Sequence, residues 1–203
     1  MLRLALRLTP ALPRWEGERR RVYSGLPLLP AGEGGRAYNC AVPAEQTESI
    51  ETEIGRRLTE RALTVAVAES CTGGLIGHRL TNVAGSSAYF LGGIIAYAYD
   101  AKEHLLGVRH NTLYEHGAVS EATVREMARG ARQALRTDIG LAVTGIAGPG
   151  GGLPGKPVGT VWVGLSARDT ELAQQFLWNA DRVGNKELSA QAALEMLLAY
   201  LKR

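Results

Sequence analysis

Two hydroxyls and a thiol stand side by side where an apolar run meets two glycines: Ser70, Cys71 and Thr72 in the stretch AESCTGG. Residues 63–69 have the composition of a buried strand, and residues 73–83 are typical of a helix. Unpaired N–H groups at a helix N-terminus can hold a phosphate, a carboxylate or a developing oxyanion. The turn is therefore a candidate site for nucleophilic chemistry, although Ser70 or Thr72 could also cap an ordinary turn.

The choice between the two nucleophiles is open at this point. A thiol beside a helix N-terminus is a reasonable nucleophile because that field lowers its pKa, which favours Cys71. A serine needs a base to remove its proton, so Ser70 depends on a suitable partner elsewhere in the chain.

Such a base is offered by Lys102, one of four lysines in the chain. It follows a strand predicted at residues 92–98, and in the crevice at the strand end desolvation would lower the pKa of its amine towards that of a general base. It could also be a solvated lysine in the first turn of a helix, and the residues leave both possibilities open. The four histidines have no metal-ligand spacing, so neither a metal site nor a serine–histidine–aspartate triad is expected.

A glycine-rich loop at residues 146–157 follows another predicted strand, residues 139–145. Gly150 to Lys156 has the spacing of a nucleotide phosphate-binding loop. Pro157 stands where that loop needs a hydroxyl, and a strand-like run follows instead of a helix, so we reject this interpretation. The loop is either a wall that lets a ligand approach the backbone closely or a wide connection between strands.

The remaining elements define the fold class. Helical periodicity with one apolar face predicts helices at residues 50–63, 120–137 and 185–201. Two further strands, at residues 158–168 and 172–179, are joined by a turn near Asp169. Helices alternate with strands first and a hairpin follows, which predicts a three-layer α/β/α sandwich with a mixed sheet.

Composition divides the 203 residues at residue 44. Residues 1–44 hold seven arginines, three glutamates and five of the eight prolines, whereas residues 45–203 hold 16 basic and 17 acidic side chains. The near-neutral body argues against a nucleic-acid-binding face, and no apolar run is long enough to span a membrane. Two cysteines are too few for a disulfide framework, so a cytoplasmic protein is expected.

The first 44 residues form a basic, proline-rich leader without hydrophobic periodicity, which predicts disorder or loose packing. The sequence allows several interpretations of this leader. It is a non-functional extension, an organellar transit peptide or the product of a start site placed too far upstream, or else it is a basic arm that contacts an anionic partner. At the other end of the chain, the aliphatic helix LEMLLAYL could pack in the core or at a subunit interface. A homo-oligomer, most simply a dimer, is expected.

The chain also resembles a known family. AESCTGG, AGSSAYFLGGIIAYAYDAK, LLGV, HGAVSE, TGIAGPGGG and KPVGTVW occur in the order and spacing of the CinA carboxy-terminal domain family, whose active members are nicotinamide-nucleotide amidohydrolases. The match runs over residues 45–203, and the leader is too short to be the molybdopterin-binding-like domain that precedes this domain in the larger CinA proteins. The resemblance implies hydrolysis of the carboxamide of nicotinamide mononucleotide to nicotinic acid mononucleotide and ammonia, without metal or organic cofactor.

The resemblance also implies roles for individual residues. Ser70 resembles the nucleophile, Lys102 the general base and Tyr97 a partner in proton transfer. Thr144 and Arg182 resemble positions that contact substrate. On chemical grounds rather than from the resemblance, backbone N–H groups after Ser70 would hold the oxyanion, and Arg182 with the glycine-rich wall 148–152 would hold the nucleotide phosphate. The positions expected to contact substrate are Thr72, Gly73, Thr144, Gly145, Gly148 and Arg182.

Three positions depart from the family pattern. Gly150 replaces the usual aspartate, Ala180 replaces a glycine, and Lys186 replaces an arginine, which bears on substrate affinity more than on the chemistry. A second hypothesis is a nucleotide-binding module without catalysis that has a regulatory role linked to competence or DNA damage. A third is DNA contact through the arginines of the leader.

Overall fold

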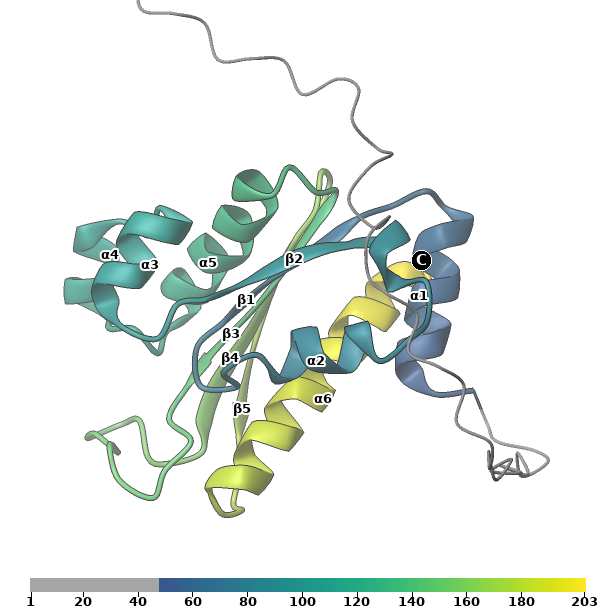
Figure 1. Ribbon diagram of the computed structural model, residues 1–203. Helices are drawn as coiled ribbons and strands as arrows, with labels where there is room; N and C mark the ends of the chain where they lie inside the picture. The colour runs from purple at the N-terminus through teal and green to yellow at the C-terminus, as the bar shows by residue number, and fades with distance from the viewer. Residues whose placement is uncertain (1–47) are drawn as a thin grey trace, which may run out of the picture. The chain divides into compact units, whose positions relative to one another are not determined.

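The computed structural model describes residues 48–203, and Figure 1 shows their arrangement. The leader predicted at residues 1–44 lies outside this range. The elements in chain order are α1 (Ile50–Glu60), β1 (Val65–Glu69), α2 (Leu75–Thr81), a short 3-10 helix (Ser86–Ala88), β2 (Phe90–Ile95), α3 (Tyr99–Leu106), α4 (His110–His116), α5 (Glu121–Ala134), β3 (Ile139–Gly145), β4 (Thr160–Ser166), β5 (Glu171–Leu177) and α6 (Arg182–Leu201).

The five strands form one mixed sheet in the order β2-β1-β3-β4-β5. The strands β2, β1 and β3 are parallel, whereas β4 is antiparallel to both β3 and β5. The carboxyl ends of the three parallel strands therefore lie at one edge of the sheet. The predicted mixed sheet is confirmed, and the strand β4 after the glycine-rich loop agrees with the rejection of a phosphate-binding loop there.

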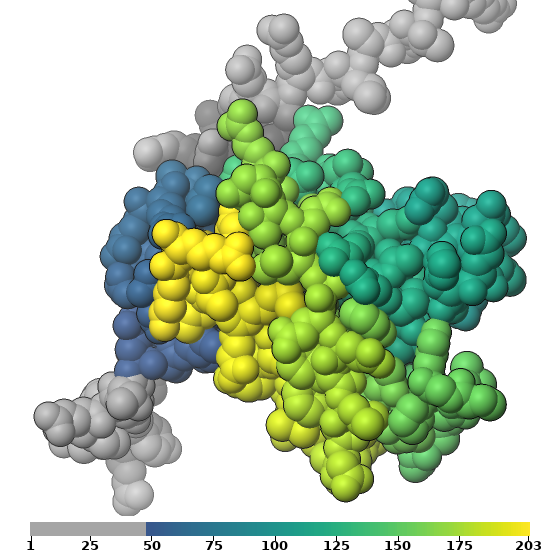
Figure 2. All heavy atoms as spheres, turned by 180° about the vertical axis from the view of Figure 1, so that it is seen from behind, coloured from purple at the N-terminus to yellow at the C-terminus, as the bar shows by residue number. Residues whose placement is uncertain are grey.

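Helices cover both faces of the sheet (Figure 1), which confirms the three-layer α/β/α architecture. Side chains of β1 alternate between the layers, because successive residues of a strand point to opposite faces. Val65 and Val67 pack with α1, α2 and α6, and Ala66 and Ala68 pack with α3, α4 and α5. Figure 2 shows the opposite side of the molecule, where α6 in yellow lies beside α1 in blue.

The C-terminal helix α6 uses its apolar face within the chain. Leu194, Leu197 and Leu201 are fully buried in the core under the sheet. They are therefore not available to a subunit interface, and the homo-oligomer stays a prediction.

Several element boundaries differ from the sequence-based expectation. The strand β2 ends at Ile95, three residues before the predicted end, because the chain turns there into α3. Helix α4 was not predicted, since its sequence HNTLYEH shows no extended apolar face. Helix α6 begins at Arg182, where the side chain of Asp181 caps it by accepting a hydrogen bond of 2.8 Å from Gly184 N–H.

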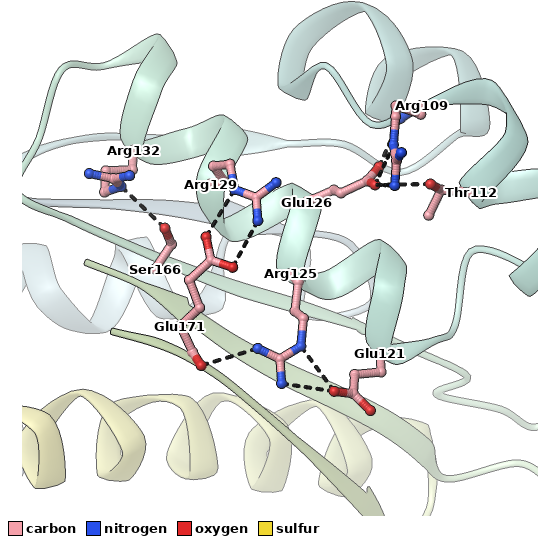
Figure 3. Close-up of polar contacts among 9 residues, drawn as sticks. All are labelled: Arg109, Thr112, Glu121, Arg125, Glu126, Arg129, Arg132, Ser166 and Glu171. Carbon is pink, nitrogen blue, oxygen red and sulfur yellow. Dashed lines mark hydrogen bonds and ion pairs between the residues drawn. The ribbon is translucent and has the colours of Figure 1, made fainter. Parts of the chain in front are cut away.

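Arginines of α5 fasten this helix to the edge strand β5 (Figure 3). Arg129 donates two hydrogen bonds, of 2.9 and 2.8 Å, to the carboxylate of Glu171. Arg125 bonds both the carboxylate of Glu121 and the main-chain oxygen of Glu171. Exposed pairs of this kind contribute at most about 1 kcal/mol each. Their main consequence is that these cationic groups already have partners inside the chain.

Within residues 48–203, every helix is too short or too polar to cross a bilayer.

The close packing of α5 on its neighbours gives a stability prediction. A Cβ atom on Gly130 would lie 2.0 Å from the main-chain oxygen of Leu106, a backbone atom that cannot easily move. Alanine normally stabilises a helix relative to glycine by about 1 kcal/mol. We expect Gly130→Ala to destabilise the protein instead, lowering the free energy of unfolding measured by urea denaturation by about 2 kcal/mol. The cost of overpacking at this position exceeds the stabilisation from the higher helix propensity of alanine.

The matched control is Gly150→Ala, since a Cβ atom at Gly150 meets nothing within 4 Å. Its unfolding free energy should equal that of the wild type. A stabilised Gly130→Ala variant would contradict the packing described for α5.

Candidate active site

The segments that follow the three parallel strands meet at the carboxyl edge of the sheet. Ser70 N–H donates to the oxygen of Val143 in β3 at 3.0 Å, and Ala96 N–H donates to the oxygen of Glu69 in β1 at 2.8 Å. These bonds extend the sheet pairing by one residue beyond β1 and β2. The turn that carries Ser70 is thus held between its two neighbouring strands.

Lys102 reaches this turn from α3. Its Nζ lies 3.0 Å from Ser70 Oγ, 2.7 Å from the oxygen of Ala96 and 3.3 Å from the oxygen of Tyr97. The lysine is 1% exposed, so the expectation of a solvated first-turn lysine is wrong, and its amine lies buried beside Ser70. The early end of β2 at Ile95 is what turns the carbonyls of Ala96 and Tyr97 towards the amine.

The environment of this amine makes its charged form less stable than that of a lysine in water. Burial lowers the pKa of Lys102 from 10.5 to about 8, because the charged form loses its hydration. Two main-chain carbonyls accept hydrogen bonds from the amine. In the neutral amine these two bonds use both N–H groups, which leaves the lone pair directed at the Ser70 hydroxyl.

Cys71 lies in a different environment from its neighbour. Its side chain is buried in the core cluster that contains Val67 and Ile76, on the α2 side of the sheet. Burial raises the pKa of the Cys71 thiol to about 11. The thiol therefore stays protonated near neutral pH, and the argument that a helix N-terminus activates it does not hold here.

The N-terminus of α2 is already occupied by a side chain of the protein. The carboxylate of Glu69 accepts hydrogen bonds from the N–H groups of Gly74, Ile76 and Gly77. The expectation that this helix end is open to a substrate anion is therefore wrong. The capping role considered for Ser70 or Thr72 is also wrong, because α2 has no side-chain cap at its N-cap residue.

Two backbone donors beside Ser70 remain. Gly73 N–H is used in a turn to the oxygen of Ser70 at 3.1 Å. The N–H groups of Cys71 and Thr72 donate to no oxygen atom among residues 48–203, and their interaction within the chain is with the weakly accepting sulfur of Cys71. These two donors are the candidates for an oxyanion hole. The hydroxyl of Thr72 is likewise buried without a partner in the described part of the chain.

A second group of predicted residues lies around Arg182. This guanidinium donates to the oxygen of Gly148 at 2.6 Å and to the hydroxyl of Tyr97 at 3.0 Å. Arg182 forms no ion pair with a carboxylate within residues 48–203. Tyr97 joins the two groups, because its carbonyl contacts Lys102 while its 61% exposed side chain contacts Arg182.

The position of Arg182 depends on Asn185, which sequence analysis missed. Asn185 is buried, donates to the oxygen of Ala147 at 3.1 Å and accepts from Ala180 N–H at 3.1 Å. It thereby fixes the glycine-rich loop to the start of α6. Ala180 contributes only its N–H group here, so this contact does not depend on its side chain.

Thr144 and Gly145 end the central strand β3. The Thr144 hydroxyl donates to the oxygen of Ala118 at 2.8 Å, which ties β3 to the start of α5. A Cβ atom on Gly145 would lie 2.5 Å from the side chain of Val161. Among residues 48–203 no hydrogen bond joins either residue to Ser70, and their substrate contacts stay predictions.

The buried carboxylate of Glu69 is the other feature that sequence analysis left without a role. The signal was present, since a charged residue ends an otherwise apolar strand directly before the turn.

Among residues 48–203 there is no group of three or more histidine, cysteine, aspartate or glutamate side chains that could hold a metal ion.

A mixed α/β sheet with a serine and a buried lysine at the edge of its parallel strands defines the class: an α/β protein with a serine–lysine site. Residues 47–201 match the family described as the CinA C-terminal domain. The chain therefore belongs to the CinA family, and the resemblance inferred from the sequence motifs is confirmed.

Relatives and solved structures agree with this assignment. A putative competence-damage inducible protein of Halothermothrix orenii is 53% identical over 159 residues, which cover 78% of this chain and 38% of that protein. A CinA-like protein of Salinibacter ruber is 54% identical over 147 residues, 72% of this chain and 36% of that protein. The chain thus spans about two fifths of the length of these relatives.

Among solved structures, the competence damage-inducible protein A of Klebsiella pneumoniae superposes with a TM-score of 0.74 at 35% identity, covering 76% of this chain and 96% of that one. The competence/damage inducible protein CihA of Agrobacterium tumefaciens has a TM-score of 0.70 at 44% identity, with the same two coverages of 76% and 96%. The names of these proteins give a family and describe induction by competence or damage, but they name no reaction.

Proposed function

We propose that this protein hydrolyses the carboxamide of nicotinamide mononucleotide to nicotinic acid mononucleotide and ammonia. The observation that carries the proposal is the 3.0 Å contact between Ser70 Oγ and the buried amine of Lys102. The family resemblance supplies the substrate, and the site supplies a nucleophile with an adjacent base. The substrate is a small-molecule nucleotide, the proposed mechanism uses no cofactor, and the free thiol of Cys71 suits a reducing cytoplasm.

The first half of the reaction forms an acyl-enzyme. Ser70 Oγ attacks the amide carbon while neutral Lys102 takes the hydroxyl proton. The N–H groups of Cys71 and Thr72 stabilise the negative charge that develops on the amide oxygen. When this intermediate collapses, the C–N bond breaks, and the leaving nitrogen takes the proton from Lys102 and departs as ammonia.

The second half reverses these roles with water. Lys102 removes a proton from a water molecule, whose oxygen attacks the ester carbon of the acyl-enzyme. Collapse of the second intermediate breaks the bond to Ser70 Oγ, which regains a proton from Lys102. The product carboxylic acid then ionises and the enzyme returns to its starting state.

Arg182 is the proposed anchor for the nucleotide phosphate. It is a cation whose two acceptors, the Gly148 carbonyl and the Tyr97 hydroxyl, are neutral. A guanidinium binds a phosphate through paired, charge-assisted hydrogen bonds. The amide would then lie at Ser70 and the phosphate at Arg182. The proton-transfer role expected for Tyr97 stays a prediction, since its hydroxyl contacts Arg182 rather than Ser70 or Lys102.

The nucleophile and base are tested by ammonia release from nicotinamide mononucleotide. We expect Ser70→Ala and Lys102→Met to lose at least about 1000-fold in kcat, because nucleophile and base act as one unit. Cys71→Ala should retain activity within about threefold, since this thiol lies in the apolar core.

Circular dichroism of each variant checks that the fold is retained. Full activity of Ser70→Ala together with an inactive Cys71→Ala would overturn the serine assignment. Binding of the mononucleotide by the wild type with no turnover would instead favour the non-catalytic nucleotide-binding module.

The pKa of Lys102 predicts the pH dependence. The amine is a base only when neutral, and its lowered pKa of about 8 means that roughly a tenth of it is neutral at pH 7. We expect kcat/KM to rise about tenfold per pH unit below pH 8 and to level off above it. The substrate phosphate titrates near pH 6, outside a measured window of pH 6.5 to 9.5. A profile that is flat or falls with rising pH across that window would contradict Lys102 as the base.

The anchor is tested by comparing two substrates. Arg182→Met should raise KM for nicotinamide mononucleotide by about tenfold or more, since hydrogen bonds to a charged group contribute about 1.5–3 kcal/mol. It should leave KM for nicotinamide riboside, which lacks the phosphate, unchanged. The control is Arg61→Met, at the C-terminal end of α1. An equal loss with both substrates would mean that Arg182 acts by holding Tyr97 and the glycine-rich loop.

A further inference from the structure

Glu69 is a charged residue placed where the strand pattern calls for an apolar one. It ends β1, in which all five residues are buried, and it is itself 1% exposed. A carboxylate removed from water is unfavourable unless its oxygen atoms find other donors. Its partners must therefore come from within the fold.

The donors come from the first turn of α2. Glu69 Oε2 accepts from Gly74 N–H at 2.9 Å and from Ile76 N–H at 3.2 Å, and Oε1 accepts from Gly77 N–H at 2.9 Å. One side chain thus replaces the missing intrahelical acceptors of a helix that has no side-chain cap at its N-cap residue.

Successive side chains of β1 point to opposite faces of the sheet, so the Glu69 carboxylate lies on the other face from Lys102. Glu69 points to the α2 side of the sheet, and the next residue, Ser70, meets Lys102 from α3 on the other side. The main chain at this point is also fixed laterally, through Ser70 N–H to Val143 and Ala96 N–H to the Glu69 oxygen. The nucleophile is therefore held from both faces of the sheet.

We propose that Glu69 is a positioning residue for Ser70: its carboxylate fixes the turn 70–77, so that the nucleophile stays at Lys102 and the N–H groups of Cys71 and Thr72 stay free for the oxyanion. This inference rests on the proposed serine–lysine mechanism. Glu69 touches no reacting atom, so its effect falls on kcat while substrate binding at Arg182 is unchanged.

The experiment compares Glu69→Gln with Glu69→Asp and with the control Glu126→Gln. Glu126 is a matched carboxylate, since it also accepts a backbone N–H, from Arg109 at 2.9 Å, but it joins α5 to α4. Two rates are measured: turnover of nicotinamide mononucleotide, and covalent labelling of Ser70 by a fluorophosphonate read by mass spectrometry. The labelling reports on the nucleophile whichever substrate the enzyme uses. Circular dichroism gives the folded fraction.

For Glu69→Gln we expect kcat and the labelling rate to fall by about 100-fold per folded molecule, with KM within about threefold of wild type, as for a misplaced nucleophile. Glu69→Asp keeps the charge but is shorter, so it should fold and lose about tenfold. Glu126→Gln should keep both rates.

Three results would overturn the inference. In the first, Glu69→Gln keeps both turnover and Ser70 labelling within about threefold of wild type. If Glu69→Gln does not fold, the same result for Glu69→Asp counts instead. In the second, Glu126→Gln loses as much as Glu69→Gln. In the third, KM rises while kcat is unchanged. Failure of the wild type to label at Ser70 would overturn the serine mechanism itself, whereas labelling without turnover of the mononucleotide would reject only the substrate.

Discussion

An amine loses its hydration when it is buried, and Lys102 has only three neutral oxygen atoms to bond in place of water. Burial without a carboxylate partner lowers the pKa of the amine to about 8, which makes it a base near neutral pH. The carbonyls of Ala96 and Tyr97 lie in the short connection between β2, which ends at Ile95, and α3, which begins at Tyr99. The surroundings of the amine are thus built from the segment where the edge strand gives way to a helix.

The second constraint is the two-residue period of β1. Adjacent side chains in a strand point to opposite faces, so Glu69 and Ser70 must enter different layers of the sandwich. The helix α2 then has to offer its N–H groups on one side, and α3 has to bring its lysine on the other. A shift of one residue in the pairing of β1 would exchange the two faces and bury a serine where the carboxylate is needed. The strands β2 and β3 on either side hold the register against such a shift.

Much of this fold could be predicted from the sequence, because long periodic segments such as α5 and short apolar strands such as β3 carry strong local signals. Helix α4 could not be predicted, since its order depends on a tertiary contact: Glu126 of α5 accepts Arg109 N–H just before the helix begins. The location of Ser70 and Lys102 near strand ends followed from spacing. Their contact depends on the packing of α3 against the sheet, and the burial of Cys71 depends on the core formed by distant helices, so neither could be read from neighbouring residues.

The two groups at the sheet edge differ in charge, and this difference bears on the proposed substrate. Ser70 and Lys102 lie opposite the carboxylate of Glu69, which is on the α2 side, whereas Arg182 is a cation with neutral partners. Tyr97 spans the two, with its carbonyl at the amine and its hydroxyl at the guanidinium. The proposed substrate, with a neutral amide at one end and an anion at the other, has the distribution of charge that fits both groups.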